Sequence, residues 1–105
     1  MVTPEYNGSI PAVVKNAIDW LSRPFGDGAV TAKPLAVIGA AGGRYGGVWA
    51  HDETRKSLGA AGARVVEGIS LSIPISSLDG KDPRDSAEVV DSVGEVLKKL
   101  AADVD

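Results

Sequence analysis

The segment KPLAVIGAAGGRYGG, residues 33–47, decides the fold class. Its continuous apolar run from Leu35 to Ile38 is typical of a strand that is buried on both faces. Five glycines follow between Gly39 and Gly47, and the residues after them have a weakly amphipathic helical pattern. The stretch therefore predicts one strand-loop-helix unit of a parallel sheet, with a glycine-rich loop at the carboxyl end of the strand.

Strand and helix patterns alternate along the rest of the chain. Residues 1–2 resemble the end of a buried strand, and a second strand region is predicted within residues 63–75, around Val65 and Val66. Apolar residues recur at helical spacing in the segments 11–23, 48–61 and 82–100. This order predicts an α/β fold, a three-layer parallel sheet with helices on both faces, formed by residues 1–105 as a single domain.

Local signals give the expected ends of these helices. Ser9 is a plausible N-cap, with Pro11 in the first turn, and the helix should stop before Pro24. The last helix is expected to begin at Asp82 and Pro83. In the middle helix, the inward face is assigned to Ala50, Thr54 and Leu58, and the helix should end at Gly59 and Gly62.

Two unusual loops, TPEYNGS at residues 3–9 and GAAGGRYGG at residues 39–47, follow predicted strands. Ligands bind outside the carboxyl ends of strands in open parallel sheets, so the two loops should be neighbours at a binding site. The glycines suit a backbone that approaches a ligand closely. Neither the G-x-G-x-x-G nor the G-x-x-x-x-G-K-[ST] fingerprint is present, so an anion, a carbonyl edge or a flat heterocycle all remain candidate ligands.

Composition argues against several classes of function. The net charge is −3, the 11 Lys and Arg residues are scattered, and a nucleic-acid partner is not expected. With no cysteine and one histidine, no metal site is expected. No apolar run approaches the ~20 residues of a membrane helix, and no signal peptide is recognisable, so we expect a cytoplasmic protein without membrane contact.

The stretch TPEYNGSIPAVVKNAIDWLSRP, residues 3–24, resembles the signature of the NADPH-dependent FMN reductase family. These flavodoxin-like proteins include quinone, chromate and azo-dye reductases. The glycine loop with the following GGVWAHDETRKSL resembles that family's second flavin-facing loop. The resemblance implies an FMN-dependent NAD(P)H oxidoreductase that uses FMN and NADPH or NADH, and that passes a hydride through flavin N5 to a small-molecule electron acceptor.

The resemblance also assigns site residues. One border of the isoalloxazine ring is implied for Pro4, Glu5, Tyr6, Asn7, Gly8 and Ser9, and the other border for Gly42, Gly43, Arg44, Tyr45 and Gly46. Hydride transfer between stacked rings needs positioning rather than a side-chain base, so no catalytic side chain is expected. His51 is expected at the surface or at a subunit interface.

The family pattern is incomplete in this chain. Family members begin with a strand and a loop resembling G-S-x-R-x-x-S-x-N that holds the FMN phosphate, and this sequence has no such motif. The resemblance therefore implies that residues 1–105 are a single partial flavodoxin-like domain, the carboxyl-terminal portion of the fold, with an unpaired strand edge. Such an edge predicts a homo-oligomer or pairing with a chain that supplies the amino-terminal half. The alternative is a non-catalytic flavodoxin-like assembly module without bound flavin.

Overall fold

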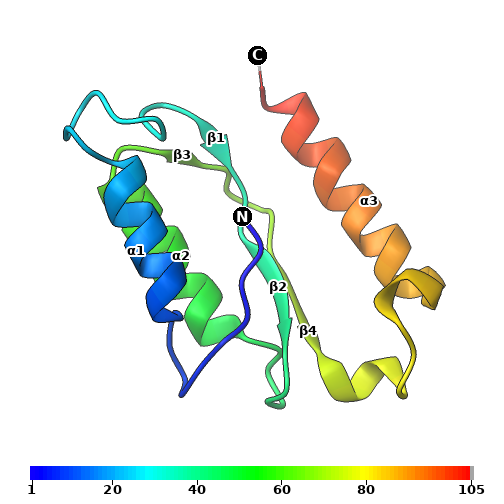
Figure 1. Ribbon diagram of the computed structural model, residues 1–105. Helices are drawn as coiled ribbons and strands as arrows, with labels where there is room; N and C mark the ends of the chain where they lie inside the picture. Colours follow the sequence, from blue (N-terminus) through cyan, green and yellow to red (C-terminus); the bar gives the residue numbers. More distant parts are fainter. Residues whose placement is uncertain (105) are drawn as a thin grey trace.

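The structure, a computed structural model, describes residues 1–104 and has three layers (Figure 1). Helices α1 and α2 lie on one side of the strands, and helix α3 lies on the other side. In chain order the elements are α1 (Ala12–Leu21), β1 (Pro34–Leu35), β2 (Ile38–Ala41), α2 (Val48–Ala60), β3 (Arg64–Val65), β4 (Leu71–Pro74), the 3-10 turns η1 (Ile75–Leu78) and η2 (Pro83–Asp85), and α3 (Ala87–Ala102). The predicted alternation of strands and helices is confirmed.

All strand pairs described are parallel. β1 pairs with β3, and β2 pairs with β4 in the register Ile38 to Leu71. On the other side of β2, Val2 forms a parallel bridge with Ile38, and the Thr3 amide donates to the Ile38 carbonyl over 3.1 Å. Residues 1–3 therefore lie beside β2 with strand-like hydrogen bonds, and β2 is flanked on both sides.

Two adjacent residues between β1 and β2 divide the core between the two faces of the sheet. Val37 packs with Ile18 and Leu58 beneath α1 and α2. Ala36 packs with Ile69 and Val96 beneath α3. Successive side chains of an extended strand point to opposite faces, which is why a continuous apolar run suits this position.

The sheet is interrupted between its two halves. Leu35 pairs with Val65 but Ile38 pairs with Leu71, so the segment between β3 and β4 is longer than the segment between β1 and β2 and forms a bulge. Arg55 of α2 donates from Nη1 to the Val37 carbonyl over 3.0 Å at this interruption. A side chain thus replaces the ladder hydrogen bond that the bulge removes, which keeps a buried carbonyl paired.

The helix ends differ from the sequence prediction in three places. Pro11 is itself the N-cap residue of α1, and no side chain caps that end, so the expected capping role of Ser9 is wrong. Asp82 and Pro83 begin the turn η2, whereas α3 begins after Ser86, whose hydroxyl accepts from the Val89 amide.

The third difference concerns α2, which continues through Gly59 to Ala60. Gly62 follows with a φ of 102°, a left-handed conformation typical of the residue after a helix. The predicted inward face is confirmed, because Ala50, Thr54 and Leu58 are all fully buried. Among the described residues, no helix has the length and apolar character that crossing a membrane requires.

Candidate functional site

The first loop, residues 4–9, is a two-residue β-hairpin. The Tyr6 and Ser9 backbones exchange two hydrogen bonds of 3.0 Å each. Asn7 and Gly8 occupy the turn with φ values of 54° and 72°. Positive φ at both central residues defines the type I′ turn, which explains the Asn-Gly pair. The hairpin leaves the Tyr6 side chain 60% exposed at the end of the sheet.

Two carboxylates connect this hairpin with α2. Glu5 Oε2 accepts from the Ala50 amide over 3.1 Å, so the hairpin caps the first turn of α2. In the other direction, Glu53 Oε2 accepts from the Ser9 hydroxyl over 2.6 Å and from the Ile10 amide over 3.3 Å. The Ser9 hydroxyl, followed by the Ile10 amide, lowers the pKa of Glu53 from its ordinary value. The charged form of Glu53 is thereby favoured.

In the structure the second loop is shorter than the sequence indicates, residues 42–46, because β2 extends to Ala41 and Gly47 is the N-cap of α2. This loop combines open and packed glycines. Gly42 and Gly43 are exposed, and a Cβ added to either would meet no atom within 4 Å. Gly46 is buried with a φ of 65°, and a Cβ there would lie 2.6 Å from the Ile73 carbonyl carbon. The loop is therefore fixed at Gly46 against β4 and presents bare backbone at Gly42 and Gly43.

An exposed aromatic group joins the two loops. The rings of Tyr45 and Trp49 lie 5.7 Å apart, tilted by 53°, and the Arg44 guanidinium lies 5.3 Å from the centre of the Tyr45 ring. The Trp49 ring also lies over Gly8, where an added Cβ would be 3.6 Å from Cε3. Trp49 therefore contacts both loops, and the prediction that the loops are neighbours is confirmed.

His51 is fully buried, so the expectation of a surface or interface position is wrong. Its Nε2 lies 2.8 Å from the Thr3 carbonyl, and its Nδ1 lies 2.6 Å from the Ser72 hydroxyl. A carbonyl can only accept, so Nε2 carries a proton and donates to it. The helical spacing of Gly47, Ala50, His51, Thr54 and Leu58 indicates one shared face, and this signal places His51 inward.

The residues assigned to the ring borders divide into two groups. Glu5, Ser9 and Gly46 take part in contacts that hold the loops, and Gly8 lies beneath Trp49. The remaining residues are exposed at the end of the sheet, and they are Pro4, Tyr6, Asn7, Gly42, Gly43, Arg44 and Tyr45. The sequence pattern assigned neither Glu53 nor Trp49 to the site.

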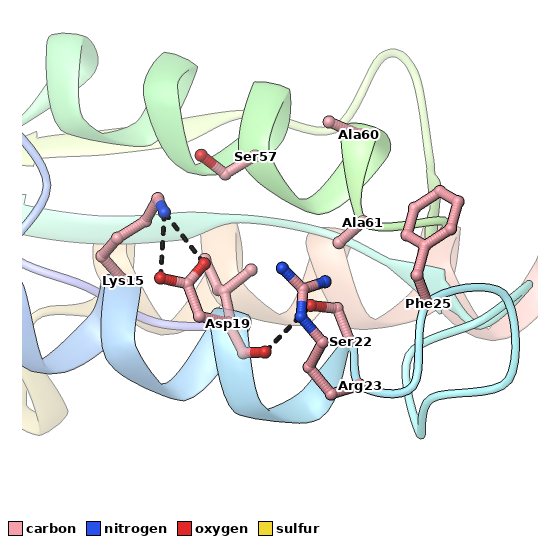
Figure 2. A pocket seen from close by; sticks show the side chains of 9 residues that line it. Lys15, Asp19, Ser22, Arg23, Phe25, Ser57, Ala60 and Ala61 are labelled. Atoms are coloured by element: carbon pink, nitrogen blue, oxygen red, sulfur yellow. Dashed lines mark hydrogen bonds and ion pairs between the residues drawn. The ribbon is translucent and has the colours of Figure 1, made fainter.

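A cleft of about 290 Å³ lies elsewhere, between the carboxyl-terminal halves of α1 and α2 (Figure 2). Lys15 and Asp19 form an ion pair of 2.8 Å at this cleft, and the Phe25 side chain also lines it. The two loops precede the amino-terminal ends of the same helices. The cleft is therefore separate from the loops, and none of the predicted ring-border residues lines it.

Comparison with known proteins supplies independent information. Residues 1–77 match the family model described as NADPH-dependent FMN reductase. A quinone reductase of Pseudomonas putida strain KT2440 is 51% identical over 57 residues, which cover 54% of this chain and 31% of that relative. A 2-hydroxy-1,4-benzoquinone reductase of a Burkholderia species is 49% identical over 55 residues, which cover 52% of this chain and 30% of that relative.

A solved structure covers nearly the whole chain. FerB, a flavoenzyme NAD(P)H:(acceptor) oxidoreductase from Paracoccus denitrificans, matches 98% of this chain and 56% of its own with a TM-score of 0.71 and 29% identity. The predicted flavodoxin-like fold class is thereby confirmed. The chain spans about a third of the length of the curated relatives it matches.

Proposed function

Because this chain belongs to the NADPH-dependent FMN reductase family, we propose that it forms the flavin-ring side of an FMN-dependent NAD(P)H oxidoreductase. Residues 1–105 are, in this proposal, the carboxyl-terminal part of one flavodoxin-like domain. The acceptor is a small molecule, and the names of the two reductases described above favour a quinone. The observation that carries the proposal is the convergence of the two loops at the same end of the sheet (Figure 1).

The exposed part of the second loop fits a flat ring. Gly42 and Gly43 offer backbone with free space beside each α-carbon, so a ring can lie against the peptide groups. We assign one border of the ring to Pro4, Glu5, Tyr6, Asn7, Gly8 and Ser9 and the other to Gly42, Gly43, Arg44, Tyr45 and Gly46. FMN supplies the hydride-accepting N5 when it is bound.

The chain's own groups position and polarise the ring in this proposal. Backbone donors of the glycine loop stabilise negative charge at the ring edge, and Arg44 adds a positive charge beside them. Glu5 and Glu53 hold the hairpin against α2, so the borders are set before ligand binding. No side-chain base is required, because the transferred group is a hydride.

The proposal includes a partner surface for the rest of the fold. Val2 is 73% exposed on the edge strand, and α3 exposes Val90 and Leu97. An almost wholly apolar cleft of about 420 Å³ lies beside these α3 residues, lined by Pro83, Arg84, Val89, Val90, Val93, Gly94 and Leu97. A strand added beside Val2 and a helix laid on α3 would bury both surfaces. We assign this place to the amino-terminal half of the family fold, supplied by a longer or a second chain.

The first test is flavin binding by the 105-residue chain, measured by quenching of FMN fluorescence. The designed variant is Gly43→Val, which fills the open space beside the loop where φ is not positive. Gly59→Ala is the control, because this glycine also has open space beside it but lies in α2, away from the loops. We expect Gly43→Val to weaken FMN binding at least about tenfold at unchanged thermal stability, and we expect Gly59→Ala to bind FMN as the unsubstituted protein does.

The second arm repeats the titration and an NADPH oxidation assay with the amino-terminal half supplied. If the phosphate-binding loop of the amino-terminal half contributes most of the affinity for FMN, we expect binding only when that half is supplied. If the completed protein neither binds FMN nor oxidises NADPH, the proposal that it is an FMN-dependent oxidoreductase is refuted. The chain would then be the alternative, a non-catalytic assembly module.

A further inference from the structure

The His51 ring is the point at which the ends of both loops meet. His51 lies one helical turn after Gly47, the residue directly after the second loop, and the His51 backbone amide donates to the Gly47 carbonyl over 3.0 Å. Its Nε2 reaches the Thr3 carbonyl, directly before the first loop. Its Nδ1 reaches Ser72, the ladder partner of Gly39. The ring therefore spans three neighbouring strands.

Two glycines create the space that the ring occupies. A Cβ on Gly39 would lie 2.6 Å from His51 Nε2 and 2.0 Å from the Thr3 carbonyl oxygen. A Cβ on Gly47 would lie 3.0 Å from His51 Cε1. Glycine in the interior of a strand often marks such a close approach. The position is thus specific for a flat side chain that crosses the strand at Gly39.

We propose that His51 is a positioning residue that sets the distance between the two ring-border loops. This inference rests on the proposed function, since the loops are those assigned to the flavin ring. A hydrogen bond from His51 to Thr3 fixes where the hairpin leaves the sheet. The same ring bonds Ser72 of β4 and packs closely against Gly47, which fixes where the second loop returns to α2. Loss of the ring frees one loop relative to the other.

The test uses substitutions that separate positioning from burial. His51→Gln keeps an N–H donor for Thr3, whereas His51→Leu keeps apolar volume without any donor. The matched control is Thr54→Val, because Thr54 is also fully buried on α2 but its hydroxyl donates to the Ala50 carbonyl within the same helix and joins no strand or loop among the described residues.

The first readout is amide hydrogen exchange at Thr3 and Gly46, measured by NMR without ligand. Both residues are buried and their amides donate to backbone carbonyls, so they report the anchors of the two loops. We expect His51→Leu to raise exchange at both amides at least about tenfold relative to Thr54→Val, and His51→Gln to restore most of the protection. An increase that is uniform along the chain, or equal in Thr54→Val, overturns the proposal.

The second readout keeps the test decisive if His51→Leu fails to fold. In the unsubstituted protein, NMR of the imidazole should find the proton on Nε2, and a ring protonated on Nδ1 alone overturns the proposal. The third readout is FMN affinity, which should fall about tenfold in His51→Leu and remain unchanged in Thr54→Val. If the unsubstituted protein binds no FMN in any form, the proposed function fails, while the exchange comparison still decides the role of His51.

Discussion

Substitution of Gly39 by alanine should destabilise the fold strongly, although it adds only a methyl group. The added carbon would lie 2.0 Å from the Thr3 carbonyl oxygen, a backbone atom that no rotamer change can move away. Overpacking of this kind costs about 1–3 kcal/mol. Displacement of Thr3 also breaks its hydrogen bonds to Ile38 and His51, each worth about 1 kcal/mol. The expected loss is therefore about 3–5 kcal/mol.

Urea denaturation followed by far-ultraviolet circular dichroism measures this loss, and thermal unfolding should show a midpoint lowered by more than about 12 °C. Gly59→Ala is the matched control, because an added Cβ meets nothing within 4 Å in α2. That variant should gain about 0.5–1 kcal/mol, since glycine is unfavourable inside a helix. A Gly39→Ala protein within about 0.5 kcal/mol of the unsubstituted protein would refute the packing argument.

Three further predictions concern the loops and the bulge. The Ser9 hydroxyl lowers the pKa of Glu53 from its ordinary value of 4.5. The hydrogen bond between Ser9 and Glu53 therefore stabilises the fold at pH values above 4.5, and this stabilisation is lost as the pH falls through the lower pKa of the folded state. The unsubstituted protein should have a higher free energy of unfolding than Glu53→Gln, and this difference, measured by urea denaturation across the same pH range, should shrink towards acid pH. Gly8→Ala should cost about 1–2 kcal/mol in urea denaturation, because φ is 72°. Arg55→Met should cost about 1–3 kcal/mol in the same assay, because the buried Val37 carbonyl loses its donor.

The sequence predicts well whatever depends on local pattern. The apolar run from Leu35 to Ile38 identified the strand region. Its side chains point alternately to the two faces of the sheet, which explains the two separate core clusters. The Asn7-Gly8 pair is typical of the tight turn that it forms, and the helical period of α2 identified its inner face. Each of these features follows from residues within a few positions of one another, so a single sequence contains the necessary information.

Contacts between distant segments were not predictable in the same way. Ser9 is of a residue type that is common at N-caps, yet its hydroxyl donates to Glu53, which lies 44 residues away in the sequence. The sequence pattern assigned no contact to Arg55, because its partner, the Val37 carbonyl, is left without a ladder hydrogen bond only by the bulge between β3 and β4. His51 could have been placed inward from its spacing, but its bonds to Thr3 and Ser72 depend on the strand order.

The division between holding and exposed residues has a physical reason. A loop rich in glycine loses much conformational entropy when a ligand orders it, and this loss weakens binding. Here Glu5, Glu53 and His51 hold the ends of both loops through polar contacts that leave the Gly42 and Gly43 backbone uncovered. Most of the ordering cost is then met during folding rather than during binding. A site of this design should lose ligand affinity when Glu53 or His51 is changed, although neither residue belongs to the assigned ring borders.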